Sequence, residues 1–309
     1  MQRSLPRREP TSSAPERTAF VLAGGASLGA IEAGMLEALY ERNLRADVFV
    51  GASAGALNAA FAAANPQEVD TARALQATWR AIRRRDIFPF SPLTALRALL
   101  GRSDHLVSDK ALRRVIQERL GSMDRLEDAR AQLGVVVTDL LEGRERVIGS
   151  GPAKPALLAS AAIPGIFPPV EVDGRLYVDG GVADNTPINV AHALGATTIY
   201  VLATGVGVSL DQPPPSALAM SVHAFNLLLH TRLREDIRAF RSRVRLVVLP
   251  PPWPLAVLPS DFSHAGQLIR SGLENAREAL SHPDPATAPT DHAITCLQNP
   301  TPTTPSGRT

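Results

Sequence analysis

Cysteine, long apolar runs and an excess of charge of one sign are all scarce in this sequence of 309 residues. The single cysteine, Cys296, excludes an intrachain disulfide framework and is compatible with a reducing compartment. No apolar run reaches the ~18 residues expected of a transmembrane helix. The formal net charge of +2 gives no reason to expect nucleic-acid binding. These absences favour a cytoplasmic protein, with peripheral contact to a membrane still open.

A cluster of residues with metal-ligand spacing is also lacking. The sequence has one cysteine, and its histidines do not cluster with Asp or Glu at ligand spacing. We therefore predict no metal site and no cofactor. The composition is otherwise that of an ordinary globular protein, with 45% hydrophobic and 20% charged residues, and the chain is long enough to bury a large core.

The two ends of the chain differ in composition from its middle. Residues 1–17 are charged and rich in Pro and Ser, without the apolar segment of a secretory signal, and we expect a disordered leader. Residues 282–309 are rich in Pro and Thr and cannot bury enough apolar surface to offset the entropy of ordering. The folded unit is therefore expected over residues 18–281, as one domain.

Short apolar runs alternate with helical patterns along that unit. Residues 20–23 and 48–50 are each followed by a helical segment, and this strand–helix–strand–helix order predicts an α/β fold with a mostly parallel central sheet. Asp173-Gly174 predicts a hairpin turn. The remaining expected strands are 133–138, 170–172, 175–178, 198–202 and 244–249, and the remaining expected helices are 108–120, 217–241 and 264–280.

Residues 51–55 read Gly-Ala-Ser-Ala-Gly and match the nucleophile elbow G-x-S-x-G, with Ser53 at its centre. The turn from strand to helix is so tight that it needs small neighbours such as Gly51 and Gly55. It lifts the serine hydroxyl to the end of the sheet and points a helix N-terminus at it, which attracts developing negative charge. The alternative is an ordinary small-residue helix start without chemistry.

A glycine-rich turn, Gly24 to Gly29 (GGASLG), lies between the first strand and the first helix. Backbone N–H groups in such a turn can stabilise an oxyanion. The competing interpretation is the dinucleotide fingerprint G-x-G-x-x-G. In this sequence Ala26 occupies the position of the fingerprint's middle glycine. Asp47 is at a distance suitable for a ribose partner, but it precedes the second strand instead of ending it.

Asp179 ends the expected strand 176–178 and is followed by Gly180 and Gly181. A carboxylate at the end of a strand, with two glycines behind it, can approach a serine closely and act as a base. The alternative is an aspartate that caps a glycine turn, which is common in loops.

These motifs together resemble the patatin-like phospholipase family, over nearly all of residues 20–280. The glycine turn, the elbow, the segment Ala161 to Pro169 (AAIPGIFPP) and Asp179-Gly180-Gly181 occur in the order typical of that family. The resemblance implies a three-layer α/β/α fold and hydrolysis of lipid esters by a Ser–Asp dyad. It assigns Ser53 as nucleophile, Asp179 as general base, and the oxyanion hole to Gly24, Gly25 and Ala26. The accompanying motif glycines are Gly29, Gly51, Gly55, Gly180 and Gly181.

Two positions depart from the family pattern. Ala26 stands where the family usually has a third glycine. An alanine at this position keeps the backbone N–H, provided that φ need not be strongly positive. Leu28 stands where the family often has a basic residue, so that a cation near the oxyanion is missing. We expect Leu28 to be a packed core residue, because it begins an apolar helical pattern with Ile31 and Met35.

Two other functions remain open from the sequence. The first is a Ser–His–Asp hydrolase, since His192, His223, His230 and His264 follow Asp179. Each of them falls in or beside an expected helix, which for His192 is a further helix expected to begin near Pro187. The second is a catalytically silent protein that binds lipid or a partner on the same scaffold.

The expected partners are a lipid or phospholipid substrate and the surface of a membrane or micelle. Two segments could contact that surface. Residues 79–107 mix arginines with aromatic residues and could form an interfacial cap or simply pack on the sheet edge. The loop around Trp253 could present apolar side chains or be a packed connector.

Overall fold

The structure is a computed structural model that describes residues 16–89, 100–101, 103–119, 123–205, 213–214, 216–252, 257–282 and 286. Several features considered above lie outside the described residues: Cys296, Trp253, most of the expected leader and tail, and residues 90–99 and 102 of the expected cap.

Within the described residues, one mixed sheet of eight strands forms the centre of the molecule. The strand order is β5-β6-β3-β2-β1-β7-β8, and β4 pairs with β3 off this path. Five neighbouring strands run parallel to one another: β3, β2, β1, β7 and β8. Strands β4 and β6 are antiparallel to β3, and β5 is antiparallel to β6. The strands are β1 (Thr18–Leu22), β2 (Val48–Ala52), β3 (Gln132–Asp139), β4 (Arg144–Ile148), β5 (Val170–Val172), β6 (Arg175–Asp179), β7 (Thr198–Leu202) and β8 (Arg245–Leu249).

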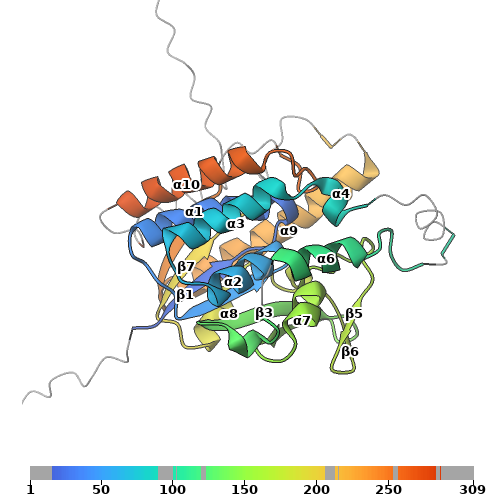
Figure 1. Ribbon diagram of the computed structural model, residues 1–309, viewed down its shortest axis with the longest axis horizontal. Helices are drawn as coiled ribbons and strands as arrows, with labels where there is room; N and C mark the ends of the chain where they lie inside the picture. The colour runs from blue at the N-terminus through green and yellow to red at the C-terminus, as the bar shows by residue number, and fades with distance from the viewer. Residues whose placement is uncertain are drawn as a thin grey trace, which may run out of the picture.

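Helices cover both faces of this sheet (Figure 1). One face carries α1 (Gly29–Glu41), α2 (Ala54–Ala64), α3 (Val69–Ala81), α4 (Arg84–Ile87), α6 (Lys110–Arg119), α7 (Ala153–Ser160) and α10 (Ala265–Ser281). The other face carries α8 (Ile188–Ala193) and α9 (Ala217–Phe240). The result is a three-layer α/β/α arrangement.

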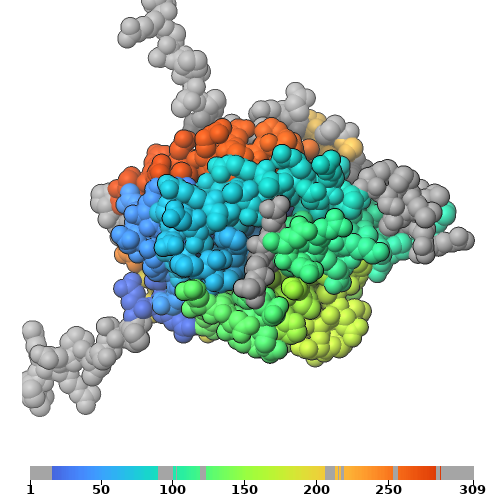
Figure 2. All heavy atoms as spheres, viewed as in Figure 1, coloured from blue at the N-terminus to red at the C-terminus, as the bar shows by residue number. Residues whose placement is uncertain are grey.

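Helix α1 lies inside its layer and is buried along nearly its whole length, because α3 and α10 pack over it. Gly34 on α1 and Gly272 on α10 permit this close packing, since a Cβ at either position would overlap the backbone of the other helix. In the space-filling view α10, α3 and α6 form much of the visible face (Figure 2). The strands β1 and β2 are almost entirely buried between the two layers, as expected for parallel strands covered on both sides.

The predicted α/β fold with a mostly parallel sheet is confirmed, and so are the predicted strands and the Asp173-Gly174 hairpin. The expectations missed β4, α3 and α7. Strand β4 reads RERVI and lies at an edge with little burial, so it lacks the apolar pattern that marks the central strands. The expected cap is only partly described. Within it, Trp79 and Ile87 are buried against the body, while Arg83, Arg84 and Arg85 are exposed.

Candidate active site

Ser53 occupies the sharp turn between β2 and α2. Its backbone has φ 54° and ψ −126°, in the left-handed region of φ that non-glycine residues rarely adopt. Such a conformation costs on the order of 1–3 kcal/mol and persists only where the surroundings impose it. Here the Ser53 N–H donates to Ser160 Oγ at 3.0 Å, and Ser160 Oγ donates to the Val136 carbonyl at 2.6 Å. Ser53 as a whole residue is 7% exposed.

The glycines of the elbow are required by close packing. A Cβ at Gly51 would lie 2.5 Å from the carbonyl carbon of Gly55. A Cβ at Gly55 would overlap the carbonyl of Leu22 at the end of β1. The elbow therefore fits between β1 and α2 only with hydrogen at both positions, as the sequence pattern predicted.

Asp179 approaches Ser53 from across the sheet. Its strand, β6, runs antiparallel to β3, with Asp179 opposite Val137, whereas β2 runs parallel to β3 with Ala52 opposite Val136. The end of β6 thus meets the residue that follows the end of β2. Ser53 Oγ donates to Asp179 Oδ2 at 2.6 Å, and the Gly181 N–H donates to Asp179 Oδ1 at 2.8 Å.

The carboxylate of Asp179 is buried. Loss of solvation raises its pKa from 3.8 to about 6, against the opposing effect of the hydrogen bonds from Ser53 and Gly181. A base with a pKa just below neutrality is ionised at pH 7 and still holds a proton well enough to accept one from a serine.

Two residues that no sequence motif marks, Thr138 and Ser160, hold this pair in place. Thr138 Oγ1 donates to the Asp179 carbonyl at 2.8 Å and accepts the Ala183 N–H at 3.1 Å. Ser160 supports the Ser53 backbone, as described above. Both residues come from segments without a recognisable motif, and only the strand register brings them to the site.

The glycine turn lies beside Ser53 but differs from the expectation in one donor. The Gly24 N–H, expected in the oxyanion hole, instead donates to the Asn185 carbonyl at 3.0 Å. Asn185 Nδ2 donates back to the Gly24 carbonyl at 3.2 Å, so that Asn185 ties the turn to the segment after Asp179. A Cβ at Gly24 would overlap Asn185 Oδ1, which explains this glycine. The N–H groups of Gly25 and Ala26 have no backbone partner among the described residues.

Ala26 does adopt a strongly positive φ, 50°. The expectation that an alanine can replace the family's glycine without strain required a φ that is not strongly positive, and this condition is not met. Ala26 therefore holds its N–H in place at a cost of about 1 kcal/mol relative to glycine. The other departure, Leu28, is 1% exposed and belongs to the main hydrophobic core, as predicted. Asp47, considered above as a ribose partner, accepts the Thr18 N–H at 2.8 Å.

None of the histidines that the structure describes lies between Ser53 and Asp179, whose side chains contact each other directly. His192 packs against the ring of Phe240, with centroids 5.4 Å apart, and His264 lies 3.1 Å from Asp261. His230 lines a cavity that also reaches Ser53, but no hydrogen bond joins it to Ser53 or Asp179.

We therefore expect single replacements of His192, His223, His230 and His264 by glutamine to leave hydrolysis of p-nitrophenyl butyrate within a few-fold of wild type. The measurement is kcat/KM for each purified variant, with circular dichroism to show that it is folded. A loss of about 10³-fold at one position in a folded protein would indicate a triad instead.

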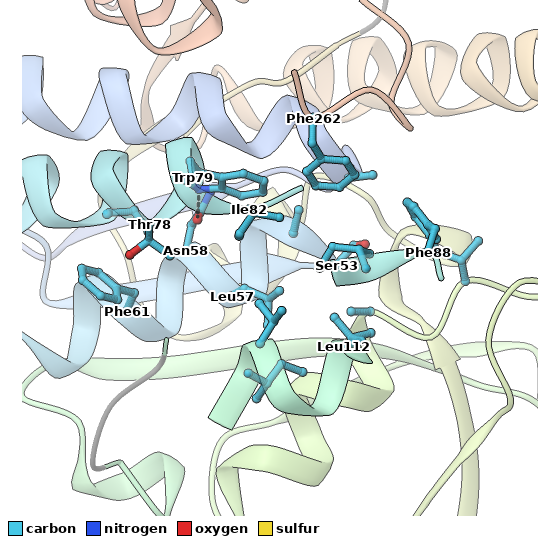
Figure 3. Close-up of a pocket in the computed structure, with 18 of the residues that line it drawn as sticks. Ser53, Leu57, Asn58, Phe61, Thr78, Trp79, Ile82, Phe88, Leu112 and Phe262 are labelled. Atoms are coloured by element: carbon cyan, nitrogen blue, oxygen red, sulfur yellow. Dashed lines mark hydrogen bonds between the residues drawn. The ribbon is translucent and has the colours of Figure 1, made fainter. Parts of the chain in front are cut away.

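An apolar cavity opens beside Ser53 and runs along α2 (Figure 3). Ser53, Leu57 and Phe61 follow each other at one-turn intervals on α2, and Phe61 lies at the far end from Phe88 in this view. The rings of Trp79 and Phe262 stack on each other above the cavity in this view, with their centroids 6.4 Å apart. Apart from Ser53, Asn58 and Thr78, the residues that line the cavity are apolar.

The polar groups of Asn58 are turned to protein partners. Its Oδ1 accepts the Trp79 indole N–H at 2.9 Å, and its Nδ2 donates to Glu32 Oε2 at 2.7 Å and to the Gly29 carbonyl at 2.9 Å. Burial raises the pKa of the Glu32 carboxyl well above its usual value. The cavity is consequently apolar in effect as well as in composition.

A second cavity, which Ser53 also lines, is formed by the glycine turn, the Asp179 loop and residues of α9. Ser53 and Ala26 line both cavities. The described residues contain no cluster of three or more His, Cys, Asp or Glu that could hold a metal ion. No helix within those residues is long and apolar enough to cross a membrane.

Residues 20–192 match the patatin-like phospholipase family, and the chain belongs to that family. It is 31% identical over 206 residues to an uncharacterised NTE family protein of Mycobacterium tuberculosis, a match that covers 67% of this chain and 53% of that protein. It is 27% identical over 211 residues to the lysophospholipase NTE1 of Mycosarcoma maydis, covering 68% of this chain and 11% of that protein. The chain thus corresponds to about half, or much less, of the length of these relatives.

Among solved structures, the chain is similar to human GIVD cytosolic phospholipase A2 in complex with methyl γ-linolenyl fluorophosphonate. The TM-score is 0.46 and the sequence identity 13%, over 92% of this chain and 59% of the human protein.

Proposed function

We propose that this protein is a serine acyl hydrolase that cleaves lipid esters with a Ser53–Asp179 dyad. The observation that carries the proposal is the 2.6 Å hydrogen bond from Ser53 Oγ to Asp179 Oδ2 at the junction of two cavities, one of them apolar. Family membership supports it, since patatin-like phospholipases are typically acyl hydrolases.

The proposed reaction has two stages, acylation of Ser53 and hydrolysis of the acyl-enzyme. Ser53 Oγ attacks the ester carbonyl while its proton passes to Asp179, and the carbonyl oxygen becomes an oxyanion. When the intermediate collapses, the proton passes from Asp179 to the leaving alcohol, and the acyl group remains on Ser53. Water then attacks the acyl-enzyme, with Asp179 again accepting and returning a proton, and the fatty acid is released.

The oxyanion donors in this proposal are the N–H groups of Gly25 and Ala26, assisted by the N-terminus of α2. Gly24 is left out because its N–H is bound to Asn185. A donor of this kind typically contributes ~3–4 kcal/mol to the transition state. Since Leu28 is apolar, no side-chain cation at that position adds to these backbone groups.

The apolar cavity is proposed to hold one acyl chain. Leu57 lies between Ser53 and Phe61 along α2, so a larger side chain there should shorten the space available. We expect Leu57→Trp to lower kcat/KM for a palmitoyl ester about tenfold or more while leaving a butyryl ester little changed. Phe61→Ala should shift the preference toward longer chains.

The assay for this prediction is a series of p-nitrophenyl esters from four to sixteen carbons. Leu141→Trp is the matched control, since Leu141 is 82% exposed in the β3–β4 turn and should not alter the chain-length profile. An unchanged profile in Leu57→Trp would place the acyl chain elsewhere.

The proposed partner surface is a lipid aggregate. Arg83, Arg84 and Arg85 are exposed at α4, and Ile87 and Phe88 beside them line the acyl cavity. Exposed arginines next to an apolar opening suit the surface of an anionic lipid layer.

The proposed function is tested by incubating the purified protein with palmitoyl lysophospholipid and measuring released fatty acid. The Ser53→Ala variant provides the blank. Release by the wild type and none by the variant is the expected result, whereas equal release would refute the assignment.

A further inference from the structure

Helix α9 has two halves that differ in composition and in burial. Residues 217–231 contain no Asp, Glu, Lys or Arg, whereas residues 232–241 are rich in charge. The second half is held to the sheet by Leu233 and Ile237, which are buried in the core. Residues of the first half instead help to form the second cavity.

One face of the first half lines that cavity. Val222, Phe225, Asn226 and Leu229 recur at intervals of three and four residues, so they share a helical face, and all four belong to the lining that includes Ser53. Val222 and Phe225 are each 42% exposed. They therefore lie where the cavity opens to solvent.

The opposite face of the same half is also apolar. Met220, Ala224, Leu227 and Leu228 are spaced i, i+4, i+7 and i+8, which places them on one helical face, outside the lining of both cavities. All four are exposed, and Leu228 is 68% exposed. A surface helix normally carries polar residues on its outward face. On α9 an exposed charged residue follows on this face only further along, at Arg238.

The apolar surface continues beside the opening on other segments. Val182, in the loop after Asp179, lines the second cavity and is exposed. Leu258 is exposed next to Pro259, which lines the cavity. The Ser27 N–H donates to the Pro259 carbonyl at 3.0 Å and the Ser27 hydroxyl donates to the Leu258 carbonyl at 3.2 Å, so this loop is tied to the glycine turn. Three separate segments thus bring exposed apolar side chains to the route toward Ser53.

Contiguous exposed apolar surface of this kind marks a contact with a protein or with a membrane. A protein seated here, a second copy of this chain included, would cover an opening that leads to Ser53 and Asp179. A lipid layer would instead bring the ester to that opening. The outward face of Met220, Leu227 and Leu228 carries no charge and so suits the apolar part of such a layer. These observations select lipid as the occupant.

We propose that the first half of α9 is an interfacial helix, in which Met220, Leu227 and Leu228 enter a phospholipid layer and seat the opening of the second cavity on it. We call these three residues the docking face. The helix then lies in the plane of the layer, as interfacial helices do, while its other face lines the cavity. A lipid ester passes from the layer to Ser53 without crossing water. The proposal rests on the proposed function, because it names the surface from which that ester is taken.

The first test measures cosedimentation with phosphatidylcholine vesicles for wild type and for Leu227→Gln/Leu228→Gln. Removing two apolar side chains from the lipid should weaken binding about tenfold or more. The loss should be similar at about 0.1 and 0.5 M salt, because screening does not affect an apolar contact. Leu227→Met/Leu228→Met is the matched control, since it keeps volume and apolar character and should bind as wild type does.

A second variant decides the question even if the glutamine variant misfolds. Leu228→Trp places a fluorophore on the docking face. Vesicles of brominated phosphatidylcholine should quench its emission more strongly than that of wild type, which carries only Trp79 and Trp253. Equal quenching of the two proteins would contradict insertion of this face.

Activity separates this proposal from the proposed function. Leu227→Gln/Leu228→Gln should hydrolyse dissolved p-nitrophenyl butyrate as wild type does, and p-nitrophenyl palmitate carried in the vesicles about tenfold more slowly. If wild type hydrolyses neither ester, the proposed function is refuted and the binding experiment still decides the docking face. If both proteins bind vesicles equally, the docking face is refuted and the hydrolase remains. A dimeric wild type with a monomeric glutamine variant in analytical ultracentrifugation would show that a second copy covers this face, and would also refute the proposal.

Discussion

Replacing Asp179 with asparagine should abolish ester hydrolysis and at the same time make the folded protein more stable at pH 8. Asparagine has nearly the shape of aspartate but cannot accept the Ser53 proton, so we expect kcat to fall by about 10⁴-fold. Ser53→Ala should show a comparable loss. Because the two residues act as one unit, the double variant should be no worse than either single variant.

The gain in stability follows from the raised pKa of Asp179. Burial raises it from 3.8 to about 6, so in wild type the carboxyl contributes fully to stability below pH 3.8, and this contribution is lost as the pH rises through about 6. A neutral asparagine avoids the loss. The melting temperature of Asp179→Asn should therefore exceed that of wild type by several degrees at pH 8, and the difference should disappear toward pH 4.

The same pKa predicts the acid limb of the activity profile. The kcat/KM of wild type should rise with pH around a midpoint of about 6, because only ionised Asp179 can act as the base. Calorimetry and p-nitrophenyl butyrate kinetics on the same samples provide both measurements. Near-normal turnover by folded Asp179→Asn would refute the dyad.

Leu28→Arg is the second change for which we expect a large effect. Leu28 is 1% exposed in the main core at the start of α1, and an arginine there would be a buried charge without a partner. Such a change typically costs about 3–5 kcal/mol, enough to lower the melting temperature by roughly 10 °C or prevent folding.

Leu28→Met is the matched control, since it keeps the volume and the apolar character and should cost less than about 1.5 kcal/mol. The comparison is made by urea unfolding of both variants. A stable Leu28→Arg protein with an altered phospholipid preference would contradict the packed position and indicate that the site has room for the cation that the family often carries.

The elements that the sequence predicted are those whose pattern is local. The buried strands Val48–Ala52 and Thr198–Leu202 are apolar runs, and the elbow needs its glycines for contacts within a few residues or with the adjacent strand. The closeness of Ser53 and Asp179 was predicted from the family resemblance and from strand ends. What the sequence could not show is that β6 runs antiparallel and delivers Asp179 from the opposite direction.

The details that were missed or wrong depend on contacts between distant segments. The Gly24 N–H is occupied because Asn185, 161 positions away, lies against the turn. The support of Ser53 by Ser160 likewise exists only once β3 and α7 are in place. His230 looked like an ordinary helical histidine, and its place in the lining of the second cavity becomes visible only when α9 is set against the sheet.

The most direct test of the central claim is covalent labelling with a fluorophosphonate, followed by intact-mass and peptide mass spectrometry. An activated serine attacks the phosphorus of such a reagent, whereas an ordinary serine does not. We expect one adduct per wild-type chain, on the peptide that contains Ser53, and no adduct on Ser53→Ala or Asp179→Asn. An unlabelled wild type, or an adduct that persists in Ser53→Ala, would contradict the claim.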